Sequence, residues 1–152
     1  KGAESLGQYA WWPSNTAIAY NAMIAPLTKF SISGVLWYQG ESNVSSYYSY
    51  EQLFTGMIDA WRAAWNKNFP FYFVQIAPYT YGNNINGALL RETQTKASRH
   101  PNTAMVVVSD LVPDTTNIHP ILKKEVAERL ANLALNKTYG YNQFVCESPL
   151  YA

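Results

Sequence analysis

The chain has 152 residues and a mass of 17.2 kDa, which is enough for one domain with a hydrophobic core. Hydrophobic residues make up 48%, aromatic residues 15% and charged residues only 14%, a mixture that excludes a disordered chain. The net charge of +1 offers no electrostatic attraction to nucleic acid or an anionic membrane. No apolar run approaches the roughly 18 residues of a membrane-spanning helix, and the single cysteine excludes an internal disulfide.

The composition favours a carbohydrate ligand. Low charge together with many Tyr, Trp and Asn residues suits a carbohydrate, because aromatic rings stack on sugar rings and amides bond hydroxyls. A large aromatic core would produce the same composition.

The chain begins at Lys1 without a methionine or a signal peptide, and no strand precedes the first helical pattern. We therefore expect a truncated or processed chain, whose start is uninformative about compartment.

Helices and strands are expected to alternate along the chain. Their ranges are a helix over 16–30 that Pro26 should end or kink, a strand over 34–38, a helix over 49–65, a strand over 70–76, a helix over 89–99, a strand over 104–108 and a helix from Pro120 to Gly140. The clearest helix is 49–65, whose apolar residues recur every 3.6 positions. The residues of that face are Leu53, Phe54, Met57, Ile58, Trp61 and Trp65.

Strands separated by helices predict a parallel sheet covered on both faces, an α/β architecture with right-handed crossovers. Such sheets commonly carry about five strands, whereas three are visible here. We therefore expect residues 1–152 to form a single domain, and to be the C-terminal portion of one whose first strand or strands lie upstream.

Ligands of parallel α/β sheets bind beyond the carboxyl ends of the strands. That rule selects three loops: one with Gln39, Gly40, Glu41, Ser42 and Asn43, one with Gln75, Tyr79 and Tyr81, and one with Asp110, Asp114, Thr116, Asn117 and His119. A histidine oriented by a carboxylate can act as a general base that activates a hydroxyl nucleophile. On spacing alone, His119 beside a proline could instead be structural, and Glu41 could simply bond loop amides.

One ten-residue motif carries a family resemblance. Residues 34–43, GVLWYQGESN, closely resemble the signature of the sialate O-acetylesterase family, whose relatives include the acetylxylan esterases of carbohydrate esterase family six in the SGNH hydrolase superfamily. Further segments match the family in the same order, namely residues 21–27, residues 69–75, Arg91, Glu92 and Gln94, Asp110 with Leu111, and residues 118–120. The resemblance extends from about residue 21 to residue 140.

The resemblance implies a flavodoxin-like, three-layer α/β/α fold and hydrolysis of sugar O-acetyl esters through a serine acyl-enzyme, without a metal or cofactor. It implies that His119 is the general base. The Gly40 N–H and Gln39 would lie near the oxyanion hole, which stabilises the charge on the carbonyl oxygen, and Asn43 would lie with them on the substrate side. In some relatives the glutamate equivalent to Glu41 orients the histidine.

The sequence departs from the family pattern in two ways. The superfamily often has an aspartate three residues before the histidine, where this chain has Thr116. The orienting acid is therefore expected to be Glu41, with Asp114 or Asp110 as alternatives, unless the site is a dyad.

The second departure is the nucleophile. The family serine lies in a Gly-Gln-Ser-Asn block, but Gly7-Gln8 is followed here by Tyr9, and Val44 excludes a nucleophile elbow around Ser42. We expect the serine on an upstream segment or a second chain, so that this chain alone would be inactive.

The sequence therefore predicts a serine carbohydrate O-acetylesterase, with O-acetylated sialic acid as the preferred substrate. The alternatives are an acetylxylan or other plant-glycan deacetylase, a sugar-binding domain without activity, and a bare structural fragment. No nucleic-acid or membrane partner is expected, and the substrate class suggests a secreted or periplasmic protein.

Other residues are assigned less specific roles. The cluster of Tyr47, Tyr48 and Tyr50 is the best candidate for a sugar platform, or else it staples the start of a helix. Arg91 could bind a substrate carboxylate but is expected to tie down a loop. His100 is expected to be a surface loop residue and Cys146 a packing thiol, whereas Trp11 and Trp12 could stack on sugar but are expected to cover the core.

Overall fold

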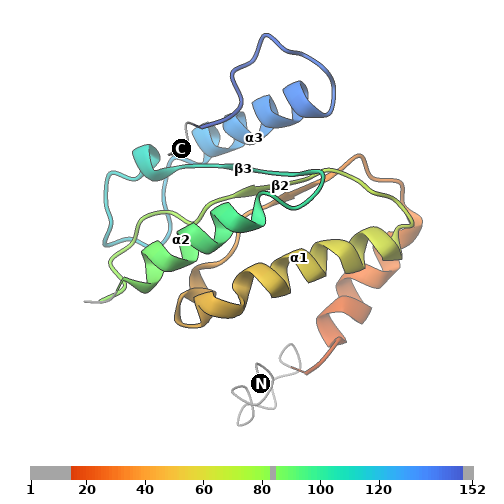
Figure 1. Cartoon of the computed structure of the whole chain (residues 1–152), viewed down its shortest axis with the longest axis horizontal. Helices are drawn as coiled ribbons and strands as arrows, with labels where there is room; N and C mark the ends of the chain where they lie inside the picture. Colours follow the sequence, from red (N-terminus) through yellow and green to blue (C-terminus); the bar gives the residue numbers. More distant parts are fainter. Residues whose placement is uncertain (1–14, 83–84, 149–152) are drawn as a thin grey trace.

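The computed structural model of the chain describes residues 15–82 and 85–148 (Figure 1). Its elements, in chain order, are η3 (Tyr20–Ile24), η4 (Ala25–Lys29), β1 (Val35–Trp37), η5 (Glu41–Ser46), α1 (Tyr47–Ala64), β2 (Phe71–Val74), α2 (Asn86–Ala97), β3 (Thr103–Val106), η6 (Ser109–Leu111) and α3 (Lys123–Lys137). None of the helices in these two ranges is long and apolar enough to cross a bilayer. The predictions on Gly7, Gln8, Tyr9, Trp11 and Trp12 lie outside the described residues.

The described strands form a parallel sheet in the order β1-β2-β3. Helices α1 and α2 lie side by side on one face of the sheet, and α3 covers the other face (Figure 1). The predicted three-layer α/β/α fold is therefore confirmed. This fold follows from the alternation of strand and helix. Parallel strands start at the same edge of the sheet, so the chain must cross back over one face, here as a helix, before each new strand begins.

Strand β2 is buried on both faces, and its side chains alternate between two cores. Phe71 and Phe73 point into a largely aromatic core beneath α1 and α2. Tyr72 and Val74 point into an aliphatic core beneath α3. On the outer strand β1, Leu36 pairs with Tyr72 but is 58% exposed, since α3 contacts β2 and β3 and leaves this part of the sheet open.

The structure corrects three of the predicted elements. The pattern over 16–30 forms two short irregular helices, η3 and η4, which break beside Pro26 as its missing N–H requires. The predicted helix start at Pro120 is wrong: Pro120 is a buried loop residue, and α3 begins at Lys123. Leu53 is not on the buried face of α1 but 65% exposed, because the inward stripe runs through Tyr50, Phe54, Ile58 and Arg62.

Arg62 is the polar member of that stripe, and it binds the amino-terminal edge of the sheet. Its Nε donates to the Phe69 carbonyl at 3.0 Å, and its two terminal nitrogens donate to the carbonyls of Pro101 at 2.9 Å and Asn102 at 2.8 Å. Phe69 precedes β2, whereas Pro101 and Asn102 precede β3. One guanidinium from α1 thus fixes the relative position of two strands at their starts.

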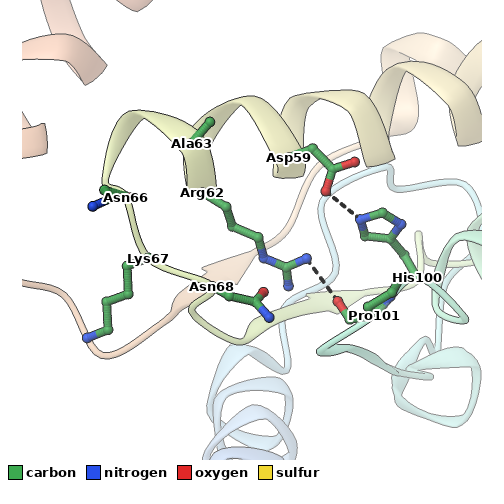
Figure 2. A pocket seen from close by; sticks show the side chains of 8 residues that line it. All are labelled: Asp59, Arg62, Ala63, Asn66, Lys67, Asn68, His100 and Pro101. Atoms are coloured by element: carbon green, nitrogen blue, oxygen red, sulfur yellow. Dashed lines mark hydrogen bonds and ion pairs between the residues drawn. The ribbon is translucent and has the colours of Figure 1, made fainter.

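A cleft of about 420 Å³ beside Arg62 opens at this same edge (Figure 2). His100 lies in it with Nε2 2.8 Å from Asp59 Oδ1, so it is a half-buried partner of α1 rather than the surface loop residue that the sequence suggested. The cleft is at the opposite end of the strands from the loops that follow them. It is therefore separate from the edge where ligands of such sheets bind.

We expect Arg62→Met to lower the free energy of unfolding by about 2–4 kcal/mol, because three charge-assisted hydrogen bonds to main-chain carbonyls are lost and the Phe69 carbonyl is left without its donor, while the apolar stem is retained. Urea denaturation would measure the change. Lys96→Met is the matched control: among the described residues, Lys96 pairs with Glu92 on the exposed surface of α2, and loss of this pair should cost less than about 0.5 kcal/mol. Equal losses in the two variants would contradict this role of Arg62.

Candidate active site

The loops that follow the three strands meet at the carboxyl edge of the sheet. The Thr80 N–H, after β2, donates to the Thr115 carbonyl in the loop after β3 at 2.9 Å. The Lys123 ammonium at the start of α3 lies 4.7 Å from the centre of the Tyr38 ring, which follows β1. These contacts bring the loops after the strands to one edge, but no hydrogen bond or ion pair joins Glu41 to His119 within the described ranges, so their predicted pairing stays a prediction.

The loop after β1 turns sharply at Gly40. Gly40 has φ 154° and ψ −18°, a conformation that only glycine adopts without strain. A Cβ here would also lie 2.8 Å from Ile76 Cγ2 and 3.0 Å from Gln94 Nε2. The turn closes with a hydrogen bond from the Asn43 N–H to the Gly40 carbonyl at 2.8 Å. This geometry explains why a glycine follows Gln39.

Gln39 and Asn43 are joined through their side chains. Gln39 Nε2 donates to Asn43 Oδ1 at 2.8 Å. A carboxamide nitrogen carries two hydrogens, so this bond orients the amide and leaves the second hydrogen available. The Gly40 N–H donates to no acceptor among residues 15–82 and 85–148. Two donors are therefore free at this edge, one from the main chain and one from a side chain.

The histidine loop is shaped by its own polar side chains. Asp114 Oδ1 accepts hydrogen bonds from the Thr116 N–H at 2.8 Å and the Thr116 hydroxyl at 2.7 Å, and these bonds lower the pKa of Asp114. Asn117 Oδ1 accepts from the His119 N–H at 2.9 Å. The buried Pro120 anchors the end of the loop. The His119 side chain is exposed, as a base that must reach a substrate can be.

Asp110 forms an ion pair that ties the start of this loop to α3. Both of its carboxylate oxygens bind the Arg129 guanidinium, one of them at 2.7 Å, and Arg129 also donates to the Val107 carbonyl. The hydrogen bonds from Arg129 lower the pKa of Asp110. Asp110 is thus occupied by α3 and Asp114 by its own loop, whereas the half-buried Glu41 carboxylate has no hydrogen-bond or ion-pair partner within the described ranges.

Two tyrosines line the same edge. The hydroxyls of Tyr38 and Tyr81 are buried and make no hydrogen bond to the part of the chain that the structure describes. Burial raises the pKa of Tyr81 to about 12, and the nearby Glu41 carboxylate contributes to the shift. Burial and Glu41 also raise the pKa of Tyr38. Both phenols are therefore protonated near neutral pH, and the Glu41 charge lies close to both.

Some predicted site residues have other surroundings than expected. Tyr50 is buried beneath the β1 loop and cannot belong to a sugar platform, while Tyr48 is 78% exposed. Ser42 is exposed on η5, and its hydroxyl makes no hydrogen bond to a histidine within the described ranges. The Arg91 carbonyl accepts from the Gln75 side chain at 3.0 Å, whereas its guanidinium has no hydrogen-bond partner in the described ranges. In those ranges, no three His, Cys, Asp or Glu side chains gather as metal ligands would.

Sequence reasoning assigned no role to two residues of this edge, Gln94 and Arg129. Gln94 is fully buried on α2 and bonds both neighbouring loops. One signal was present, since Gln94 continues the inward stripe of Leu90 and Ala97, where a polar residue needs a partner. Arg129 offered no such signal, because its partner lies in a different loop.

Comparison with known proteins identifies relatives of the chain. The sequence model of the carbohydrate esterases described as sialic acid-specific acetylesterases matches residues 1–136. Sialate O-acetylesterase of Mus musculus is 34% identical and that of Homo sapiens 32%, each over 91% of this chain. The crystal structure of a carbohydrate acetylesterase from Xanthomonas citri matches with 40% identity and a TM-score of 0.75 over 80% of this chain.

These relatives are longer than the chain. The matched region covers 29% of the Mus musculus protein, 30% of the Homo sapiens protein and 29% of the Xanthomonas citri chain. The chain thus spans less than a third of each of these relatives.

The Asp110–Arg129 ion pair should make stability depend on pH in the acid range. Because the folded pKa of Asp110 is below its ordinary value of 3.8, its contribution is present above that value and is lost as pH falls through the lowered one. We expect Asp110→Asn to reduce the free energy of unfolding at neutral pH, with the difference from wild type shrinking below about pH 4. Urea denaturation between about pH 7 and pH 2.5 would measure it. A difference that stays constant over this range would contradict the ion pair.

Proposed function

Because this chain belongs to the sialic acid-specific acetylesterase family of carbohydrate esterases, we propose that its protein removes O-acetyl groups from sugars through a serine acyl-enzyme. O-acetylated sialic acid is the proposed substrate, as the family description and the names of the mammalian relatives suggest. This chain supplies the general base and most of the oxyanion hole.

The observation that carries the proposal is the pair of free donors at the turn after β1. The Gly40 N–H and the second hydrogen of Gln39 Nε2 come from adjacent residues. Donors of this kind stabilise the negative charge that develops on an ester carbonyl oxygen as it is attacked. The special backbone of Gly40 and the bond from Gln39 to Asn43 hold both donors in place before substrate arrives.

The reaction then follows the general logic of acyl transfer. The serine hydroxyl attacks the acetyl carbonyl while His119 takes its proton, and the oxyanion forms between Gly40 and Gln39. The intermediate collapses as the sugar oxygen leaves with the proton from His119, and the acetyl group stays on the serine. Water, activated by His119, then releases acetate and restores the serine.

We propose Glu41 as the acid that orients His119. Asp110 binds Arg129 and Asp114 binds Thr116, so either would have to give up existing bonds to serve the histidine. Glu41 has no such partner in the described ranges, and it lies on the loop that also carries the oxyanion donors. An unpaired carboxylate at this edge is well suited to stabilise an imidazolium.

The nucleophile is proposed to lie on a segment absent from this chain, either upstream or on a second chain. The exposed Leu36 on the outer described strand supports this, because strands of parallel sheets are normally buried on both faces. A further segment over this apolar position would add its own loop to the same carboxyl edge. The intact mass of the complete gene product, or a second chain copurifying with it, would test the idea.

His119→Ala is expected to lower kcat/KM for acetate release by about 10²- to 10⁴-fold, the usual contribution of a general base. The measurement uses the protein expressed from its complete coding sequence, with p-nitrophenyl acetate and with O-acetylated sialic acid. His100→Ala is the matched control, since His100 lies at the opposite edge of the sheet and pairs with Asp59. Unchanged turnover by His119→Ala would refute its role. An inactive wild-type protein that still binds the sugar would favour a sugar-binding domain.

The orienting acid and the preferred sugar can be separated in the same assay. Glu41→Gln should lower kcat at least about tenfold, while Asp114→Asn should have a smaller effect. The reverse order would transfer the role to Asp114. Faster acetate release from acetylxylan than from O-acetylated sialic acid would instead assign the protein to plant-glycan deacetylation. A glycan substrate also suggests a secreted or periplasmic location, which fractionation of the producing cells would test.

A further inference from the structure

We propose that Gln94 is a positioning residue that aims the Gly40 N–H at the substrate carbonyl. The inference rests on the proposed function, because it assigns a purpose to the oxyanion loop. It starts from the placement of Gln94, which is 0% exposed and lies between the loops after β1 and β2.

The carboxamide of Gln94 serves one loop with each of its two ends. Its Oε1 accepts a hydrogen bond from the Ile76 N–H, just after β2, at 2.9 Å. Its Nε2 lies 3.5 Å from the Gln39 carbonyl oxygen, just after β1. A glutamine is suited to this place because it carries an acceptor and a donor on one rigid group. An apolar side chain would leave the buried Ile76 N–H without its acceptor, which is costly, and would remove one donor from the Gln39 carbonyl.

Tyr50 completes the arrangement from α1. Its hydroxyl donates to the same Gln39 carbonyl at 3.2 Å and lies 3.5 Å from Gln94 Nε2. Two donors from two helices therefore converge on one carbonyl oxygen. Tyr50 and Gln94 are both buried, so the Gln39 carbonyl is directed toward the interior of the protein.

The direction of that carbonyl determines the direction of the Gly40 N–H. The two groups belong to one peptide unit, and none of the described peptide bonds is cis. In a trans peptide the C=O and the following N–H point in opposite directions. With the Gln39 carbonyl held toward Gln94, the Gly40 N–H must point away from the core, toward the edge where the strand-end loops meet.

Close packing around Gly40 reinforces the orientation of this peptide unit. A Cβ on Gly40 would approach Gln94 Nε2 to 3.0 Å and the Tyr50 hydroxyl to 3.4 Å, so the peptide lies directly on the two donors. If the Gln94 amide were absent, the peptide could rotate and turn its N–H inward. Gln94 thus affects the transition state through Gly40 without touching the substrate.

The test compares Gln94→Met with Thr93→Val in the protein expressed from its complete coding sequence. Thr93 is the neighbouring buried polar residue on α2, 9% exposed, and within the described ranges its hydroxyl donates to the Leu89 carbonyl of the same helix rather than to a loop. Hydrogen–deuterium exchange of the Asn43 amide, which bonds the Gly40 carbonyl, reports the order of the loop. Amides of β2 report global stability.

We expect Gln94→Met to accelerate exchange at Asn43 by at least about tenfold relative to β2, because the loop opens locally. We expect kcat for an acetyl ester to fall at least about tenfold with little change in KM, since the oxyanion exists only in the transition state. Thr93→Val should change neither the exchange rate of Asn43 relative to β2 nor kcat. If Gln94→Met fails to fold, Tyr50→Phe removes one donor to the same carbonyl with the ring retained, and a smaller change of the same kind is expected.

Exchange at Asn43 that is unaffected in both Gln94→Met and Tyr50→Phe would overturn the proposal, whatever the activity. Equal losses of kcat in Gln94→Met and Thr93→Val would also overturn it, because they would indicate a general structural role. A wild-type protein that hydrolyses no acetyl ester would refute the proposed function instead, and the exchange measurement would still decide whether Gln94 holds the loop.

Discussion

The burial of β2 on both faces is the constraint on which the rest of the structure depends. Its side chains alternate between an aromatic core under α1 and α2 and an aliphatic core under α3, so none of them is available for chemistry. Reactive groups can therefore lie only where the strands end. This constraint places the glutamate loop and the histidine loop at one edge and gives both a rigid base.

Buried polar side chains supply hydrogen bonds to main-chain groups at the ends of the strands. Main-chain groups at the strand ends lose water but have no strand partner, and each needs a hydrogen bond. Arg62 supplies donors to three carbonyls at the amino-terminal edge. At the carboxyl edge, Gln94 and Arg129 bond the first residues of the loops. The helices thus contribute more than apolar packing, since one polar residue in each fixes the course of a neighbouring loop.

The two edges of the sheet differ in what they leave free. At the amino-terminal edge, the Arg62 guanidinium is used by carbonyls and His100 pairs with Asp59. At the carboxyl edge, the second hydrogen of the Gln39 amide, the Gly40 N–H and the Glu41 carboxylate have no partner among the described residues. A site that must bind a developing charge needs such unpaired groups, held by others that are fully bonded. The occupied pairs of Asp110 with Arg129 and Asp114 with Thr116 provide this support for the loop of His119.

Much of this protein could be predicted from its amino-acid sequence, because the informative signals are local. The alternation of apolar runs and helical periods determined the parallel three-layer fold, and one ten-residue motif determined the family. The three candidate loops followed from the rule about strand ends. Local preference was a poorer guide where burial competes with it: Pro120 lies in a loop instead of starting a helix, and Leu53 is exposed although it has the apolar period.

Only the tertiary structure decided how the groups of the site are held. That Tyr50 supports a turn from beneath, that Gln94 joins two loops 18 and 55 residues away, and that Arg129 binds Asp110 across 19 residues could not be predicted from spacing. The physical reason is that a hydrogen bond of a buried side chain depends on which backbone group is left unpaired beside it. That choice arises only when strands and helices pack together, whereas periodicity and motifs are properties of the chain alone.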